Sequence, residues 1–128
     1  MALVLLDTSV IIDAINRKRG RWELLRALVE AGDNLGCSVM SIAEVHAGMR
    51  AHERLQTGEF LDNLEHYDVN TEVACVGGML KREWAGKGRT ISITDTLIAA
   101  TALVHRLVLA TDNRRDLPMT ELVFYPLP

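Results

Sequence analysis

An apolar run without alternation begins the chain and changes to helical spacing within a few residues. Residues 3–7 read LVLLD, and over residues 9–16 Val10, Ile11 and Ala14 follow helical spacing. A continuous apolar run predicts a strand buried on both faces, and such strands occur in parallel sheets covered by helices. This feature favours an α/β fold, because a sheet with one solvated face would alternate apolar and polar residues.

The rest of the chain continues the alternation of strands and helices. Further strands are predicted at residues 35–40, 66–69, 107–111 and 123–125. Further helices are predicted at residues 22–31, 41–50, 53–65, 71–86 and 94–105, with a short one near Asn113. Strands alternating with helices predict right-handed crossovers and a three-layer α/β/α arrangement with a central parallel sheet of about five strands. The 128 residues, without repeats or a linker, predict a single domain over residues 1–128.

Two of these helices carry local signals. Ser41 and Glu44 have the spacing of a capping box, which predicts that a helix opens there. The helix over 71–86 is predicted to be interrupted at Gly77-Gly78, although it carries apolar residues at helical spacing. The two glycines would also let another backbone approach closely, so this helix has two interpretations, core packing and a dimer interface.

Acidic residues stand at or just after the ends of several predicted strands. They are Asp7, Glu44, Asp112 and Asp116. Parallel strands bring their carboxyl ends to one edge of a sheet, which is where ligands bind. Asp95 reaches the same edge if residues 87–93 run back along the sheet, a span of about 20 Å at roughly 3.3 Å per residue. We therefore expect these acids to gather in one cleft.

Most of these acids also have a structural interpretation. Glu44 fits the capping box, Asp95 and Asp116 suit the positive end of a helix dipole, and Asp112 suits an N-cap. Asp7 differs, because an acid that ends a buried strand is costly unless it is paired or holds a cation. Carboxylates that converge repel one another unless a divalent cation lies among them. With oxygen ligands and no suitably spaced Cys or His, the ion expected is Mg²⁺ or Mn²⁺.

Ser9 and the two cysteines complete the candidate list. Ser9 lies two residues after Asp7 and is interpreted as the N-cap of the first helix, as a hydroxyl bound to Asp7 or to the metal's water, or as both. Cys37 and Cys75 have no metal-ligand spacing and are interpreted as buried free thiols, in preference to a disulfide or a zinc site.

The net charge of −3 does not exclude a nucleic acid as substrate. If the five acids named above bind metal, 12 of the 17 acidic residues remain against 14 basic ones, a balance of +2. The basic loop at 17–21 and the pair Arg114-Arg115 are candidates for phosphate contacts. No apolar run approaches the roughly 18 residues of a membrane helix, and the N-terminus lacks a signal-peptide pattern, which predicts a cytoplasmic protein without a membrane anchor.

Four segments carry a resemblance to a known family. In chain order they are LLDTSVIID, SIAEV, TDTLIAATA and LATDNRRDL. Their order and spacing, and the length of the chain, resemble the PIN-domain family, and within it the VapC-type toxins of prokaryotic toxin–antitoxin pairs. The resemblance implies a Mg²⁺- or Mn²⁺-dependent ribonuclease that acts on RNA, forms a homodimer and is blocked by a cognate antitoxin reaching into its acidic cleft.

The resemblance also implies roles for the acids. Asp7, Glu44 and Asp95 match the first three acids of the family. Asp116 fits the fourth, although the next residue is Leu where the family often has Phe. Asp112 is then an additional catalytic acid or shares the fourth role. The metal ligands expected are Asp7 and Asp95 first, with Glu44 and Asp116 next.

The mechanism expected is hydrolysis of an RNA phosphodiester by a metal-activated water. Ser9 and Asn113 would orient a carboxylate or the phosphate, and Arg114 and Arg115 would hold flanking phosphates. A receiver or phosphotransfer domain is a weaker alternative, because Ser stands at position 9 and no Lys ends the strand at 107–111. A second alternative, a non-catalytic PIN-like module that binds RNA or protein, is disfavoured because no expected acid is missing.

Overall fold

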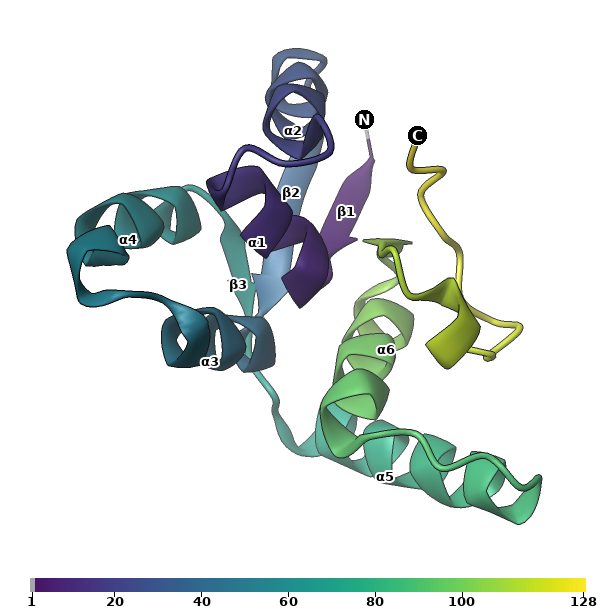
Figure 1. The fold of residues 1–128 in the computed structure, drawn as a ribbon. Helices are drawn as coiled ribbons and strands as arrows, with labels where there is room; N and C mark the ends of the chain where they lie inside the picture. Colours follow the sequence, from purple (N-terminus) through teal and green to yellow (C-terminus); the bar gives the residue numbers. More distant parts are fainter. Residues whose placement is uncertain (1) are drawn as a thin grey trace.

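In the computed structural model, which describes residues 2–128, the predicted parallel sheet forms the centre of an α/β fold (Figure 1). Its strands within that range are β1 (Leu3–Leu6), β2 (Asn34–Ser38), β3 (Glu65–Tyr67) and β4 (Val108–Ala110). Their order is β3-β2-β1-β4, and each neighbouring pair is parallel. The chain order therefore reverses between β1 and β4, which places a topological switch point beside β1.

Helices cover both faces of this sheet. They are α1 (Thr8–Ile15), α2 (Arg21–Glu30), α3 (Val39–Gly48), α4 (Arg54–Asp62), α5 (Thr71–Gly86) and α6 (Ile93–His105), with short 3₁₀ turns η1 (Ala51–Glu53) and η2 (Arg114–Asp116). Val4 and Leu6 of β1 are buried with apolar residues of α1 to α4, whereas Leu5 is buried with those of α5 and α6. Successive strand residues point to opposite faces, so an uninterrupted apolar run supplies both cores. The predicted three-layer arrangement is confirmed.

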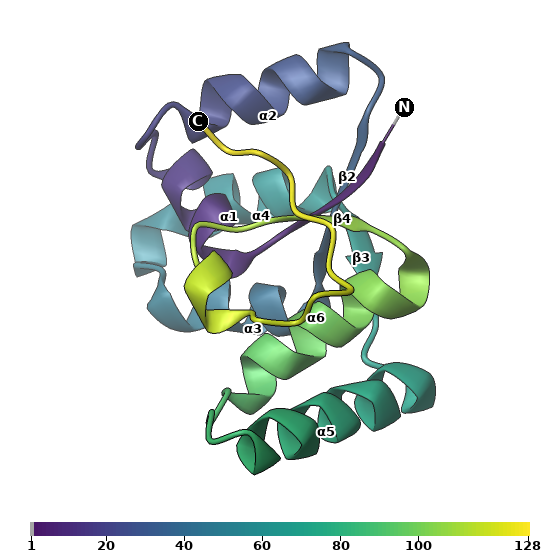
Figure 2. The same ribbon diagram turned by 90° about the vertical axis from the view of Figure 1, so that its right-hand side faces the viewer.

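The predicted fifth strand is reduced to a single bridge. Phe124 pairs in parallel with Leu109 of β4. The amide of Leu109 donates to the carbonyl of Val123 and the amide of Tyr125 donates to the carbonyl of Leu109, each at 2.8 Å. Figure 2 shows the C-terminal segment crossing β4 and continuing toward α2. The described part of the sheet thus has four strands, and the C-terminal segment covers the outer side of β4.

The predicted capping box at Ser41 is wrong. Helix α3 begins two residues earlier than expected, at Val39, and its N-cap is Ser38, whose hydroxyl accepts a hydrogen bond from the amide of Met40 at 3.1 Å. Ser41 therefore lies within the helix and is buried, and Glu44 lies on the exposed surface of the second turn. The Glu44 carboxylate therefore does not cap the helix and can bind groups outside it.

The predicted interruption at Gly77-Gly78 is also wrong, since α5 runs through both glycines. A Cβ at Gly77 would lie 2.8 Å from Cδ2 of Leu97 on α6, whereas Gly78 faces open space. Gly77 therefore permits close packing of α5 on α6, which outweighs the low helix propensity of glycine. None of the helices in the described part of the chain is long and apolar enough to cross a membrane.

Candidate functional site

Asp7 lies at the centre of the candidate site, directly after β1. It is the N-cap of α1, and its side chain is buried with 5% exposure. The Oδ1 atom accepts a hydrogen bond from the amide of Thr8 at 2.8 Å, and Oδ2 accepts one from the hydroxyl of Thr111 at 2.7 Å. Because Thr111 follows β4, this bond joins the two strands that flank the switch point. Asp7 is therefore fixed from both strands.

Glu44 approaches from α3. The hydroxyl of Thr8 donates to Oε1 of Glu44 at 2.6 Å and also lies 2.9 Å from the hydroxyl of Ser41. Thr8 is thus a link between the loop after β1 and the neighbouring helix. The sequence prediction did not include Thr8 or Thr111, because a threonine beside an acid carries no distinctive spacing.

Asp95 and Asp116 complete the acidic side of the site. Asp95 is half-buried in the first turn of α6, where its amide donates to the N-cap hydroxyl of Ser92 at 3.1 Å. Asp116 is exposed in η2. The guanidinium of Arg89, in the segment before α6, donates to the carbonyl of Arg115 at 2.6 Å and ties that segment to η2.

The carboxylates of these four acids repel one another. Burial raises the pKa of Asp7, and the charges of Asp95 and Glu44 raise it further, against hydrogen bonds from Thr111 and Thr8 that lower it. Burial likewise raises the pKa of Asp95, and the charges of Asp116 and Glu44 add to this effect while the Ser92 hydrogen bond opposes it. Since like charges at close range disfavour ionisation, the site favours a positively charged ligand.

The donor set fits a hard divalent cation. Within residues 2–128 no group of three His, Cys, Asp or Glu side chains lies close enough to hold a metal ion as a cluster. Mg²⁺ commonly takes one or two carboxylates together with waters and substrate phosphate oxygens, so a tight protein cage is not required. Buried Asp7, with its raised pKa, is the oxygen donor best placed for this role.

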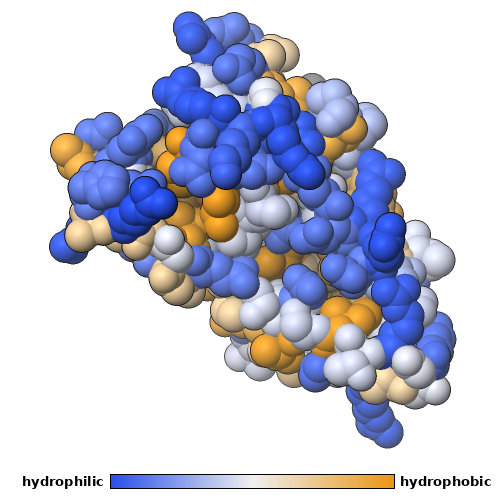
Figure 3. Space-filling view, in the orientation of Figure 1, coloured by the Kyte–Doolittle hydropathy of each residue, from blue (hydrophilic) through white to orange (hydrophobic). Residues whose placement is uncertain are grey.

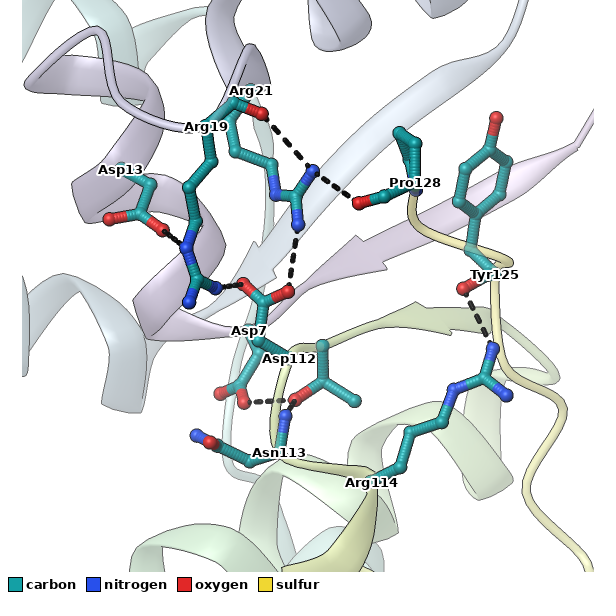
Figure 4. A network of polar contacts seen from close by, with 10 residues as sticks. Asp7, Asp13, Arg19, Arg21, Asp112, Asn113, Arg114, Tyr125 and Pro128 are labelled. Carbon is teal, nitrogen blue, oxygen red and sulfur yellow. Dashed lines mark hydrogen bonds and ion pairs between the residues drawn. The ribbon is translucent and has the colours of Figure 1, made fainter.

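Asp112 belongs to a different electrostatic group. Its Oδ1 lies 2.8 Å from Nη2 of Arg21 and its Oδ2 lies 3.4 Å from Nη1 of Arg19. Figure 4 shows both guanidinium groups pointing at this carboxylate. The side chain of Arg21 is 3% exposed, so this member of the basic loop is not accessible to RNA. The structure therefore separates Asp112 from the four repelling acids.

Of the two cysteines, Cys37 is a buried free thiol as predicted, whereas Cys75 on α5 is exposed, so its predicted burial is wrong.

The remaining predicted site residues differ in their surroundings. Ser9 is not an N-cap, since Asp7 has that role, and its hydroxyl is buried without a hydrogen-bond partner among the described residues. The amide of Asn113 donates to the Thr111 hydroxyl at 2.9 Å. Arg114 donates to the carbonyl of Tyr125 at 3.1 Å. A polar cavity of about 670 Å³ adjoins these residues, and it is lined by residues 111–116, Pro126 and Leu127.

A second, apolar groove lies apart from the acids. It has a volume of about 540 Å³ between α2 and α4, where Trp22, Leu25 and Phe60 are among its lining residues. Figure 3 shows apolar surface between polar side chains in this part of the molecule. None of the four acids lines this groove, so the chemistry of the site belongs to the sheet edge.

Comparison with known proteins identifies the family of this chain. The sequence matches the PIN domain over residues 4–120, which includes all the acids of the sheet edge. The chain belongs to the PIN-domain family. The family predicted from the four sequence segments is therefore confirmed, and the candidate site lies within the matched residues.

Curated relatives cover nearly the whole of this PIN domain. Ribonuclease VapC19 of Mycobacterium tuberculosis is 32% identical over 115 residues, which are 90% of this chain and 92% of the relative. Ribonuclease VapC10 of the same organism is 32% identical over 119 residues, 93% of this chain and 89% of the relative. The names of both relatives describe ribonucleases.

Solved structures show the same fold. The structure of VapBC2 from Rickettsia felis bound to a DNA fragment from its promoter superposes with a TM-score of 0.83 and 26% identity, covering 96% of this chain and 97% of that one. DNA-bound VapBC from Salmonella typhimurium superposes with a TM-score of 0.82 and 25% identity, covering 98% of both chains. The similarity thus extends over the whole PIN domain.

Proposed function

We propose that this PIN domain is a Mg²⁺- or Mn²⁺-dependent endoribonuclease and the toxin of a type II toxin–antitoxin pair. The observation that carries the proposal is Asp7, a buried acid at the switch point whose pKa is raised by burial and by neighbouring carboxylates. The ribonuclease names of the relatives that are 32% identical support the choice of RNA as substrate. An RNA substrate and an antitoxin partner would place the activity in the cytoplasm.

Four carboxylates are proposed to hold the metal. Asp7 and Asp95 would be direct ligands, and Glu44 and Asp116 would bind the ion or its waters. When bound, such an ion supplies Lewis-acid chemistry: it lowers the pKa of water and stabilises negative charge on the phosphodiester. Asp112, which the sequence left as a candidate for the fourth acid, is placed outside this set because two arginines already neutralise it.

The remaining residues position these acids or the substrate. Thr111 and Thr8 orient Asp7 through their hydrogen bonds, and Thr8 also orients Glu44. The hydroxyl of Ser9 is buried and unpartnered, and we propose that it would orient a carboxylate or the phosphate in the loaded site. Asn113, Arg114 and Arg115 border the polar cavity and would bind phosphates next to the scissile bond.

A cognate antitoxin is the proposed protein partner. A solved structure named as a toxin–antitoxin complex, from Klebsiella pneumoniae, supports this partner, because its fold matches 94% of this chain with a TM-score of 0.78. A homodimer is proposed from the family resemblance. The exposed side of α5 at Gly78 and Met79 is open to a second chain, whereas Gly77 is packed on α6.

Cleavage of purified RNA tests the proposal. Total RNA is incubated with the folded protein in Mg²⁺, in Mn²⁺ and in EDTA, beside Asp7→Asn and the matched surface control Asp62→Asn. Discrete fragments are expected with either metal, and are expected to be absent with EDTA and with Asp7→Asn but present with Asp62→Asn. Intact RNA in every metal condition, or equal cleavage by Asp7→Asn, would overturn the proposal. RNA that is bound but not cut would favour a non-catalytic binding module.

A further inference from the structure

Arg21 is a charged residue that the proposed reaction leaves without a role. It begins α2, its side chain is 3% exposed, and its Nε atom has no hydrogen-bond partner among the described residues. Its Nη2 binds Oδ1 of Asp112 at 2.8 Å, and its Nη1 lies 3.4 Å from the carbonyls of Arg19 and Pro128. Burying a guanidinium is costly unless it is paired, so its ion pair with Asp112 determines where this loop lies.

The loop before Arg21 has an unusual backbone. Arg17 and Arg19 have φ values of 55° and 57°, and Gly20 has a φ of 67°. A left-handed conformation is unfavourable for a residue with a side chain. Such conformations persist where surrounding contacts fix them. Here the contacts are the buried ion pair of Arg21 and the guanidinium of Arg17, which lies 3.8 Å over the ring of Trp22.

Asp112 connects this buried ion pair to the acidic edge. Asp112 is the middle residue of a turn in which the amide of Asn113 donates back to the hydroxyl oxygen of Thr111 at 2.9 Å. The Thr111 oxygen therefore accepts from one side, and its single proton is directed to Oδ2 of Asp7 at 2.7 Å. Holding the carboxylate of Asp112 fixes this turn, and the turn fixes the hydroxyl that orients Asp7.

We propose that Arg21 and Asp112 are positioning residues, and that their buried ion pair sets the Thr111 hydroxyl that orients Asp7 for metal binding. The inference rests on the proposed function, because it assigns a purpose to the orientation of a metal ligand. Hydrogen-bonding partners of metal ligands commonly change affinity or activity by about 10- to 100-fold when they are removed. The ion pair acts one step further away, so its effect must pass through Thr111.

A double-mutant cycle of Mn²⁺ affinity tests whether Asp112 acts on the metal site through Thr111. Mn²⁺ binding to the folded protein is measured by calorimetry for wild type, Thr111→Val, Asp112→Asn and the double variant. We expect Thr111→Val to weaken binding by about 10- to 100-fold and Asp112→Asn by about 10-fold. The double variant is expected to match Thr111→Val alone, because Asp112 acts through Thr111. Multiplied losses would show that Asp112 acts independently, as a ligand or through general stability, and would overturn the inference.

Two further variants separate positioning from folding. Arg21→Met removes the charge but keeps an apolar chain of similar length, and is expected to weaken Mn²⁺ binding as much as Asp112→Asn while circular dichroism confirms a folded protein. Arg26→Gln, which removes an exposed pair with Glu30 on the same helix, is the matched control and should bind Mn²⁺ like wild type. In RNA cleavage, Arg21→Met should lower kcat and leave KM unchanged; an effect on KM alone would contradict positioning.

The outcome for wild type distinguishes the two proposals. If wild type does not bind Mn²⁺ and does not cleave RNA, the proposed function and this inference are both overturned. If wild type binds Mn²⁺ and Asp112→Asn and Arg21→Met bind it equally well, the proposed function stands and the positioning role is overturned.

Discussion

Asp7 and Asp112 follow neighbouring parallel strands, so both carboxylates lie at the same edge of the sheet, but their surroundings differ. Asp7 is 5% exposed, and burial together with the charges of Asp95 and Glu44 raises its pKa. Asp112 is bound by Arg21 and Arg19, and its side chain is 18% exposed. One carboxylate lacks a counter-charge within the described residues, and the other has two.

This difference is the one we expect between a proposed metal ligand and a structural contact. An uncompensated buried carboxylate destabilises the metal-free protein, and its presence is explained when a cation binds there. A carboxylate that is paired with arginines stabilises the arrangement of the loops that it joins, and it attracts a cation only weakly. Active sites commonly retain such destabilising groups, because function requires them. The following predictions test whether the two acids differ in this way.

The largest expected effect is the loss of RNA cleavage when an acid without a counter-charge is substituted. Asp95, like Asp7, is a proposed metal ligand. Asp95→Asn should therefore reduce kcat/KM for RNA by more than about 100-fold, since removing a hydrogen-bonding partner of a metal ligand already costs about 10- to 100-fold. Circular dichroism should show an unchanged fold. The comparison would fail if Asp112→Asn abolished cleavage and Asp95→Asn did not.

The second-largest effect is on the free energy of unfolding, where substituting Asp112 should be more harmful than substituting Asp7. Asp112→Ala leaves the buried guanidinium of Arg21 without its partner and should lower the free energy of unfolding by about 3 kcal/mol in urea denaturation. The exposed pair of Arg26 and Glu30 offers the control, because Arg26→Gln should cost less than about 1 kcal/mol. Equal losses for the two variants would mean that burial does not matter to the Asp112 pair.

Metal addition should stabilise the protein through Asp7. At a Mn²⁺ concentration about 100 times the Kd, the free energy of unfolding should rise by about 2.7 kcal/mol relative to EDTA, because the ion binds the folded state. Asp7→Asn should remove most of this increase. A full increase in Asp7→Asn would place the ion elsewhere.

The smallest effect is a pH dependence of the metal-free protein. Because the folded pKa of Asp7 is raised above 3.8, the unfolded chain loses this proton first as the pH rises, so stability falls between 3.8 and the folded pKa. Asp7→Asn should therefore be more stable than wild type at pH 7 in EDTA, and this advantage should vanish below about pH 3.8. Thermal unfolding of both proteins across this range measures the difference; a constant difference would argue against a raised pKa.

Local patterns in the sequence were sufficient for the fold class and for most of the acids. The run LVLLD indicated a strand buried on both faces, and the alternation of strands and helices indicated parallel pairing, so the acids after the strands were expected at one edge. The structure agrees, because burial of an apolar run and the direction of a parallel strand are set by residues close together in the chain.

Helix boundaries were predicted less well, and the reason is competition between local signals and packing. Ser41 and Glu44 have the spacing of a capping box, but Ser38 caps α3 because β2 ends there. Gly77 has a low helix propensity, yet α5 continues through it because Leu97 packs against its bare backbone.

What the sequence by itself determined is that this PIN domain has a parallel sheet with acids along one edge. Only the tertiary structure decided which acid is neutralised and which is not. Arg21 and Asp112 are 91 residues apart, and Thr111 and Asp7 are 104 residues apart. Contacts over such separations depend on how the loops pack against each other, and no local periodicity encodes them.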